Sequence, residues 1–354
     1  MINNEIIIEL MRAAVLDRPP KLPADISINW DELMDYCAPQ GILAWVWDSV
    51  CKLPQSQKPP RMQSINWALS AQEIWDTSEK QENVLKQIIE KCNNNHIRVL
   101  LLKGIGLSNL YPKPESRSCG DIDIYLFGDY EKGNMILGNN HFDETALHSE
   151  LIYDGVTIEN HKMLIFPNTE TKRRVADYLM ERLDQTSLTE NGYYVLSPIP
   201  NLVYLLMHTL NHISYVYTLP IISIRNLVDL AMFVYKNQSN LPPQTCYQVL
   251  KTVNMDKSFE MVICLSELLL DVDLSRYHYG LISDKDIELI RKSFIKLVFD
   301  KYVESSNVLE NSRWLWNRYR KLLPISRFIP RKPRNSLFYA TVVSQLSIIN
   351  KKGN

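Results

Sequence analysis

The spacing of apolar residues changes twice along this chain of 354 residues, and each change limits what a segment can fold into. Up to about residue 95, apolar side chains recur every three or four positions, as they do in amphipathic helices. Three asparagines at 93–95 then interrupt the pattern, and the next run, residues 97–102, is short, apolar and followed by a Lys-Gly pair. Such a run is typical of a buried strand. The sequence therefore predicts an N-terminal helical region over 1–95.

Strand-like segments follow in the middle of the chain. Four runs are continuously apolar or alternate in polarity, and short helical pieces separate them. The expected strands are 97–102, 122–127, 145–153 and 156–166, and the expected helices are 105–110 and 130–138. Five of the 11 glycines, at positions 104, 106, 120, 128 and 133, fall within thirty residues of one another, which marks where the backbone needs unusual freedom. We expect a small α/β core over 96–168.

Helical spacing returns after Pro167. The expected helices are 171–183, 201–213, 224–235, 243–253, 258–270, 284–301 and 336–349. The predicted fold class is therefore α/β of the α+β type. A small mixed sheet is flanked by N-terminal helices and by a C-terminal helical domain over 169–354.

Charge and cysteine content exclude several classes of protein. The 39 basic and 40 acidic residues leave a formal charge of −1, so we expect no duplex nucleic acid as a partner. The six cysteines form no C-x-x-C pair, which argues against a zinc knuckle or a disulfide framework. The first 16 residues do not resemble a secretory signal, and no apolar run is long enough to span a bilayer. We expect a cytoplasmic protein.

The segment Gly120-Asp121-Ile122-Asp123-Ile124 carries the strongest chemical signal. Residues two apart in a strand share a face, so both carboxylates would point one way while the isoleucines enter the core. Two like charges about 4 Å apart repel by roughly 4 kcal/mol at an effective dielectric of about 20, and a divalent cation removes that penalty. Asp-x-Asp pairs also occur on solvated surfaces. The preceding glycine and the strict alternation favour a Mg²⁺ site.

A third carboxylate is expected on a neighbouring strand, because two-metal phosphoryl chemistry needs a further ligand or a base. Glu159 meets this need. Alternation along residues 156–161 puts Thr157, Glu159 and His161 on one polar face, which suits the same cleft. The alternative is an edge strand whose polar side is solvated.

Two basic residues near this segment are candidates for binding phosphate. Lys103 and Gly104 stand where a strand passes into a helix, and helix N-termini attract anions. Arg117 can clamp a phosphate bidentately, although a surface arginine is a comparable alternative. The chain lacks both G-x-x-x-x-G-K-[ST] and G-x-G-x-x-G, so Walker-type and Rossmann-type nucleotide sites lose their main support.

Together these residues resemble the nucleotidyltransferase superfamily that includes DNA polymerase beta and the aminoglycoside nucleotidyltransferases. They are more closely similar to a bacterial group described as uncharacterised nucleotidyltransferases, over roughly residues 97–235. The matching positions are Leu102, Lys103, Gly104, Leu107, Tyr111, Pro112, Arg117, Gly120, Asp121, Ile122, Asp123, Ile158, Glu159, His161, His208, Arg225, Asp229 and Leu230. Where the superfamily has a second small residue after Gly104, this chain has Ile105.

The resemblance implies transfer of a nucleoside monophosphate from an NTP to a hydroxyl of a small-molecule acceptor, with pyrophosphate leaving. Asp121, Asp123 and Glu159 would hold two Mg²⁺ ions, for which Mn²⁺ can substitute, and Glu159 would ligate or act as base. The residues implied to bind the nucleotide and its phosphates are Lys103, Gly104, Arg117 and Gly120. Those implied to line the substrate pocket are His161, His208, Arg225 and Asp229. Ile105 motivates an alternative, a catalytically silent module that binds a nucleotide or a partner protein.

Two pairs of residues four apart in the helical half have simpler alternatives. His208 and His212 have a spacing used by zinc sites, but Thr209 stands where H-E-x-x-H has its glutamate. His208 would contact substrate or pack against neighbouring helices. Arg225 and Asp229 would form a helix ion pair or brace the site.

Residues 313–334 contain eight basic and no acidic residues, interleaved with aromatic ones. Such a segment can contact an anionic membrane surface, a lipid-linked acceptor or nucleic acid. We favour the alternative, a solvated helix and loop whose aromatic side chains pack inward. The oligomeric state is left open.

Overall fold

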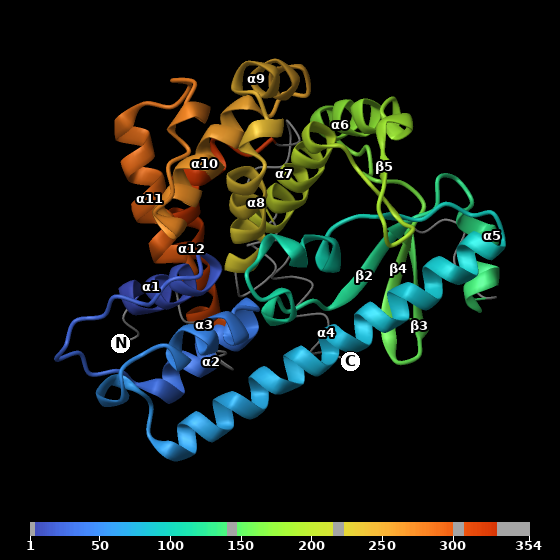
Figure 1. Cartoon of the computed structure of the whole chain (residues 1–354). Helices are drawn as coiled ribbons and strands as arrows, with labels where there is room; N and C mark the ends of the chain where they lie inside the picture. Colours follow the sequence, from blue (N-terminus) through green and yellow to red (C-terminus); the bar gives the residue numbers. More distant parts are fainter. Residues whose placement is uncertain (1–3, 140–146, 215–222, 300–307, 331–354) are drawn as a thin grey trace.

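The computed structural model describes residues 4–139, 147–214, 223–299 and 308–330. Its first part consists of α1 (Asn4–Val15), α2 (Trp30–Gln40), α3 (Leu43–Cys51) and α4 (Arg61–Asn94). α4 has 34 residues and is therefore about 50 Å long. It runs from the N-terminal helices to the far side of the sheet (Figure 1).

Local sequence sets the ends of α2. Asn29 caps its first turn, where the side chain accepts a hydrogen bond from the Glu32 amide. Gly41 ends the helix in the left-handed region, at a φ of +69°, which glycine adopts without steric cost.

The described structure contains a mixed sheet with six strands in the order β3-β4-β2-β1-β6-β5, which lies on the right in Figure 1. The strands are β1 (Leu100–Leu101), β2 (Asp121–Tyr125), β3 (His148–Tyr153), β4 (Val156–His161), β5 (Ser187–Leu188) and β6 (Tyr194–Val195). β2 runs parallel to β4 and antiparallel to β1, and β3 is antiparallel to β4. The predicted fold class, a small mixed sheet flanked by helices, is confirmed.

The strand boundaries differ from those predicted. β1 is only two residues long, and β4 ends at His161 instead of residue 166. The piece expected at 105–110 is a 3-10 helix, η2 (Gly104–Leu110). The hairpin of β5 and β6 was not predicted, and it extends the sheet beyond residue 168 through a hydrogen bond from the Tyr194 amide to the Val99 carbonyl, 2.7 Å long. Strands of two residues are too short to produce a periodic pattern.

The two faces of the sheet meet different surroundings. Ile122, Ile124 and Ile158 point into a hydrophobic cluster that also contains side chains of α4 and of α5 (Tyr130–Leu137). The opposite face carries the acidic residues of β2 and β4. α7 and α8 stand across from that face, and the larger of the two hydrophobic clusters lies behind them.

Helices make up most of the described chain after residue 167. They are α6 (Glu170–Met180), α7 (Pro198–Ser214), α8 (Ile224–Lys236), α9 (Pro243–Thr252), α10 (Asp256–Leu270), α11 (Asp284–Val298) and α12 (Val308–Ser326). The six helices expected between 171 and 301 correspond to α6–α11. The helix expected at 336–349 lies outside the described residues.

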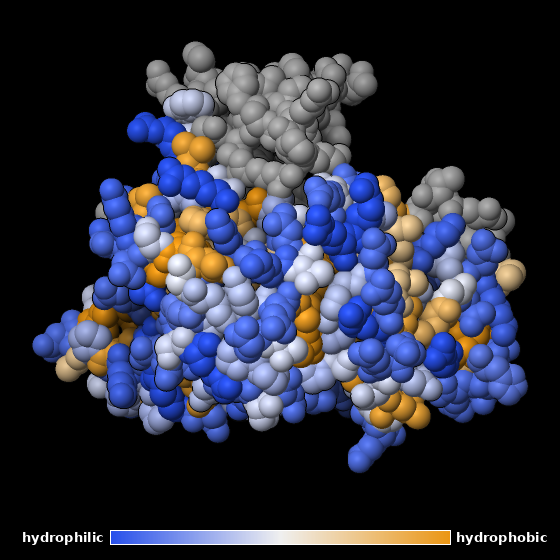
Figure 2. All heavy atoms as spheres, turned by 90° about the horizontal axis from the view of Figure 1, so that it is seen from above, coloured by the Kyte–Doolittle hydropathy of each residue, from blue (hydrophilic) through white to orange (hydrophobic). Residues whose placement is uncertain are grey.

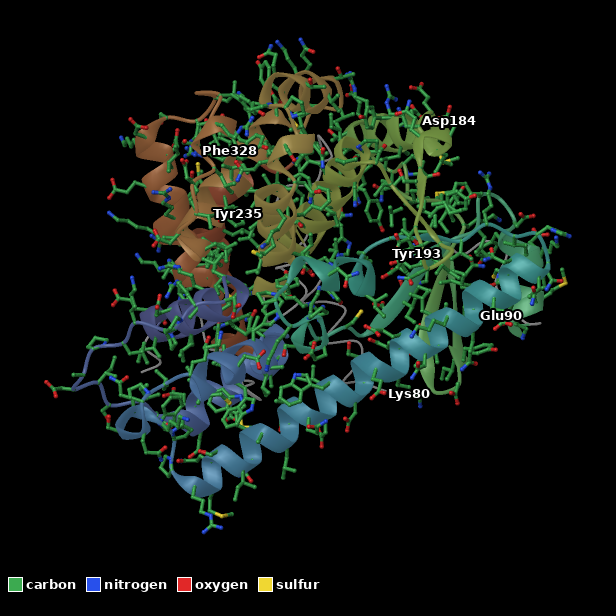
Figure 3. The ribbon with its side chains drawn as sticks, in the orientation of Figure 1. Lys80, Glu90, Asp184, Tyr193, Tyr235 and Phe328 are labelled. Carbon is green, nitrogen blue, oxygen red and sulfur yellow. The ribbon has the colours of Figure 1, made fainter. Side chains whose placement is uncertain are left out.

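α12 covers part of the basic segment 313–334. Arg318 is only 1% exposed, and its guanidinium carbon lies 5.0 Å from the centre of the Trp314 ring. Leu322 and Ile325 are fully buried. Phe328, just after α12, packs against the main core, as does Tyr235 at the end of α8 (Figure 3). One side of the described part of this segment therefore packs on the helical core.

Hydrophilic side chains cover most of the face seen in Figure 2, and hydrophobic areas are scattered among them. Within the described ranges, no helix combines the length and the apolar character needed to cross a membrane.

Candidate active site

The acidic face of the sheet is created by the register of two parallel strands. Asp123 of β2 pairs with Glu159 of β4, and Asp121 pairs with Thr157. Burial alternates strictly along β4, so Thr157, Glu159 and His161 share the less buried face. This alternation was predicted. Carboxylates 36 positions apart in the sequence thus lie on adjacent strands at the same level of the sheet.

Asp123 is the most deeply buried of these acids, with a side chain that has no exposed surface. Its Oδ1 atom lies 2.9 Å from Lys103 Nζ and 2.9 Å from His161 Nε2. Its Oδ2 atom is buried without a hydrogen-bond partner among the described residues. An unsatisfied buried acceptor costs about 1–3 kcal/mol, so this oxygen favours a ligand that can satisfy it.

His161 links the two acidic strands. Its Nε2 atom lies 3.4 Å from Glu159 Oε2 as well as close to Asp123. Burial alone would lower the pKa of His161, but the hydrogen bonds to Asp123 and Glu159 outweigh it and raise the pKa to about 9. The same contact with His161 lowers the pKa of Glu159. Without a bound cation, His161 is therefore an imidazolium at neutral pH.

Lys103 and Gly104 approach this cluster from the turn between β1 and η2. Burial is the largest single influence on Lys103 and lowers its pKa, but the charges of Asp123, Asp121 and Glu159 and the hydrogen bond to Asp123 together raise the pKa above its ordinary value, so the ammonium stays charged. Gly104 has a φ of +64°, and a Cβ atom added there would lie 2.9 Å from Cys119 Sγ and 3.9 Å from Asp123 Oδ2. Only glycine allows the turn to pass so close to the acids.

Arg117 is held by the helical half of the chain. Its Nε and Nη2 atoms donate to Asp229 of α8 at 2.8 and 2.6 Å, and the Tyr111 hydroxyl donates to Asp229 at 2.6 Å. The two charged side chains are only 3% and 6% exposed, so the alternative of a surface arginine is wrong. Nη1 of Arg117 is buried with no hydrogen-bond partner in the described chain.

Arg225 does not pair with Asp229, its neighbour four residues along α8. Its Nη1 atom instead donates to the Ser118 carbonyl at 2.7 Å. No described carboxylate lies within ion-pair distance of Arg225, and its Nε atom is buried without a hydrogen-bond partner among described residues. The helix ion pair considered from the sequence is therefore wrong, because Asp229 pairs with Arg117 instead.

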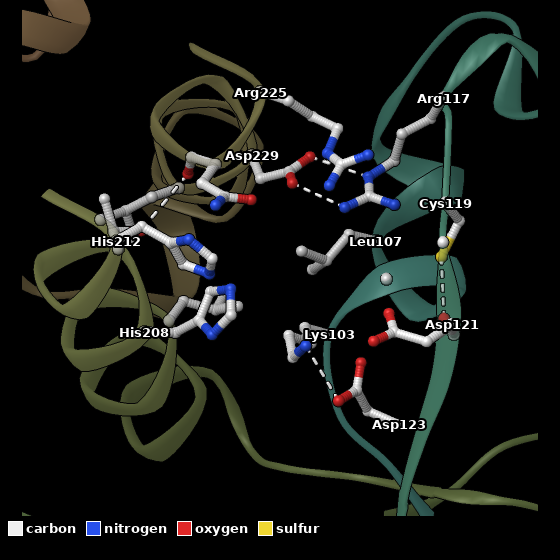
Figure 4. Close-up of a pocket in the computed structure, with 16 residues that line it drawn as sticks. Lys103, Leu107, Arg117, Cys119, Asp121, Asp123, His208, His212, Arg225 and Asp229 are labelled. Atoms are coloured by element: carbon white, nitrogen blue, oxygen red, sulfur yellow. Dashed lines mark hydrogen bonds and ion pairs between the residues drawn. The ribbon is translucent and has the colours of Figure 1, made fainter. Parts of the chain in front are cut away.

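A cavity of about 140 Å³ separates the acids from the helical half (Figure 4). Lining residues from the sheet side include Lys103, Gly104, Arg117, Cys119, Gly120, Asp121 and Asp123, and those from the helices include His208, His212, Arg225 and Asp229. Glu159 and His161 do not line this cavity. Both residues lie beside Asp123, which does line the cavity.

Two histidines of α7 form part of the helical wall. The rings of His208 and His212 meet edge to face with centroids 4.5 Å apart. Burial is the main cause that lowers the pKa of both histidines, and the positive charge of Lys103 lowers it further. Both rings are therefore neutral at pH 7. Among the described residues they are not part of a three-ligand metal group. They offer uncharged donor and acceptor atoms to a molecule in the cavity.

Sequence reasoning missed Tyr204, which is one turn before His208 on α7. Its side chain is buried, and burial raises the pKa of its hydroxyl, with a further rise from the charges of Asp123 and Glu159. Residues 204, 208 and 212 are spaced by four, so their common helix face was readable from the sequence.

The donor set suits a divalent cation. Asp123, Glu159 and His161 each offer one atom, and these atoms lie within 4.8 Å of one another. Asp121 lines the cavity beside Asp123. Carboxylate oxygens are the ligands that Mg²⁺ and Mn²⁺ use most, and the open Oδ2 atom of Asp123 leaves a donor available.

Comparison with known proteins adds a family. Residues 27–271 match the profile of a protein family described as uncharacterised nucleotidyltransferase. Searches of functionally curated proteins and of solved structures found no match. The family profile spans more than half of the chain and includes every residue of the acidic cluster and of the cavity. The chain therefore belongs to the uncharacterised nucleotidyltransferase family.

Proposed function

We propose that the protein transfers a nucleoside monophosphate from an NTP to a hydroxyl group of a small-molecule acceptor, with release of pyrophosphate. One observation carries the proposal. Asp121 and Asp123, with Glu159 in register beside them, face a cavity whose other wall contains a cationic side chain without an acidic partner among described residues, Arg225.

Asp121, Asp123 and Glu159 would hold Mg²⁺, with Mn²⁺ as a substitute. The bound ions would neutralise charge on the phosphates of the nucleotide. The lowered pKa of Glu159 favours its role as a ligand over that of a base, because a weaker base accepts a proton less readily.

The basic side chains of the cavity support binding of a triphosphate. Lys103 lies next to Asp123, where phosphate oxygens would approach the metal ligands. The Nε atom of Arg225 and the Nη1 atom of Arg117 are both buried and have no hydrogen-bond partner among the described residues. Because buried donors without acceptors are unfavourable, we expect phosphate oxygens to occupy these positions. Arg117 then serves both the fold and the nucleotide.

The helical wall supports binding of an acceptor. The neutral rings of His208 and His212 can accept a hydrogen bond from the acceptor hydroxyl and orient it, and the proton of that hydroxyl passes to solvent water as the new phosphoester bond forms. The formal charge of −1 gives no footprint for duplex nucleic acid, which favours a small molecule as the acceptor.

The experiment is an assay of pyrophosphate release with each NTP, Mg²⁺ or Mn²⁺, and a pool of hydroxyl-bearing acceptors. Asp121→Asn and Asp123→Asn are expected to lose about 10²–10³-fold in rate, the scale of removing a transition-state charge interaction, while circular dichroism stays native. Asp154→Asn, an exposed acid in the β3–β4 turn, is the matched control and should keep full activity. Full activity in either of the first two variants would contradict the assigned roles.

The silent-module alternative rested on Ile105. Its side chain is buried in the hydrophobic cluster between the sheet and α4, so it packs on the core side of η2. This placement removes the steric reason to expect an inactive phosphate site. Nucleotide binding without turnover across a broad acceptor pool would nevertheless favour the alternative.

A further inference from the structure

The acidic cluster contains one donor that is not a carboxylate. His161 ends β4, two residues after Glu159, so both side chains leave the strand on the same face. Its Nε2 atom lies 2.9 Å from Asp123 Oδ1 and 3.4 Å from Glu159 Oε2. The imidazole nitrogen therefore lies between the two acidic strands and shares the face on which a cation would bind.

These separations are the ones expected of ligands on a single ion. Two ligands that each lie about 2.1 Å from an ion, at right angles to one another, are about 3.0 Å apart. The nitrogen and the two carboxylate oxygens are all within 4.8 Å of one another. Asp123 Oδ2, fully buried and without a described partner, is a second independent sign that a ligand completes this site.

We propose that His161 is a nitrogen ligand of the divalent cation, and that the site consequently selects transition ions such as Mn²⁺ over Mg²⁺. The inference deepens the proposed function, because it concerns the metal of the same acidic cluster. Mg²⁺ strongly prefers oxygen ligands, whereas imidazole is a favourable ligand for the divalent transition metals. A carboxylate-only cluster would not discriminate in this way.

His148 of β3 occupies an outer position around this site. Its Nε2 atom lies 3.9 Å from Glu159 Oε1, and its ring centroid is 5.5 Å from that of His161. Because it lies beside one carboxylate and outside the three-donor group, it would orient Glu159 without contacting the ion. His148 therefore provides a matched control, a second imidazole on the neighbouring strand.

The test uses the full chain, free of any polyhistidine tag and stripped of metal, with Mn²⁺ alone as the probe. Electron spin-echo envelope modulation of the bound Mn²⁺ should show coupling to a ¹⁴N nucleus in the wild-type protein. His161→Gln should remove that coupling and weaken Mn²⁺ binding at least about tenfold, while the Mg²⁺ affinity, measured by competition, changes less than about threefold. His148→Gln should keep the ¹⁴N coupling. A urea titration checks that each variant remains folded.

Absence of ¹⁴N coupling in the wild-type protein, or its persistence in His161→Gln, would overturn the proposal. Equal losses of Mn²⁺ and Mg²⁺ affinity would overturn it as well, because His161 would then only position the carboxylates. The outcome is separable from that of the transferase assay. Nitrogen coupling without nucleotidyl transfer would refute the proposed function alone, and transfer without nitrogen coupling would refute this inference alone.

Discussion

Removing the charge of Asp229 tests whether the helical half holds the catalytic core through one buried ion pair. Asp229 accepts three hydrogen bonds, two from Arg117 and one from Tyr111, at 2.6–2.8 Å. Burial would lower the pKa of Arg117, but Asp229 raises it by more, so the guanidinium stays charged. Asp229→Asn keeps the size of the side chain and leaves that charge buried without its partner.

The size of the effect follows from this burial. Breaking a buried ion pair by changing one partner costs about 3–5 kcal/mol, whereas replacing both partners with apolar residues is often nearly neutral. The total stability of a domain is only about 5–15 kcal/mol, so Asp229→Asn should lose a large part of it. With a urea m-value of about 3 kcal/mol/M, the midpoint should fall by roughly 1–1.7 M.

The assay is urea unfolding followed by tryptophan fluorescence, for Asp229→Asn and for the double variant Arg117→Met/Asp229→Leu. The double variant should lose less than the sum of the two single changes, because it leaves no unpaired charge. The matched control is Glu288→Gln, which removes a carboxylate from the pair with Lys292, where both side chains are about two-thirds exposed. It should leave the midpoint unchanged. A loss below about 1 kcal/mol for Asp229→Asn, or full additivity in the double variant, would refute the reasoning.

Three further predictions concern the cavity and its neighbours. Gly104→Ala should lower the free energy of unfolding in urea by at least about 1 kcal/mol, because Gly104 has a φ of +64° and the added Cβ would lie close to Cys119 Sγ. Gly120→Ala is the control and should be nearly neutral, since no atom lies within 4 Å of the added Cβ. Equal effects of the two changes would contradict this account. Burial lowers the pKa of His208, so below pH 6.5 the unfolded chain binds a proton that the folded protein does not, and stability falls as the pH drops. His208→Gln should flatten that fall between pH 6.5 and 5 in urea midpoints, and an unchanged slope would be evidence against a neutral buried ring. A bound NTP should slow alkylation of Cys119, which lines the cavity, and leave the exposed Cys51 unaffected, as peptide mass spectrometry would reveal.

The acidic strands could be predicted because their signal is local. Alternation along β2 and β4 determines which side chains share a face, and five or six residues are enough to read it. The predicted partner of Asp123 was therefore found on the adjacent strand, in register at Glu159. The role of His161 was harder to assign, since alternation identifies its face and not the atoms it contacts. The metal roles of these residues stay predictions.

The contacts of the helical half could not be predicted, because they join residues more than a hundred positions apart. Arg225 and Asp229 are four apart on one helix, and that spacing alone favours a mutual ion pair. Tertiary packing instead directs Asp229 to Arg117 and Arg225 to the Ser118 carbonyl. The hairpin of β5 and β6 was missed for a related reason, since its two-residue strands are defined by their pairing with each other and by the pairing of β6 with β1.

The same two contacts explain why the acids and the helical bundle depend on each other. α8 holds the chain at Arg117 through Asp229 and at Ser118 through Arg225, only a few residues before β2 begins at Asp121. Fixing that segment fixes where the first carboxylate enters the cavity. An isolated core over 96–168 would contain all three acids but would lack the partner of Arg117, and it would have to expose or bury an uncompensated guanidinium. The helical half therefore positions the acidic strand in addition to forming the opposite wall of the cavity.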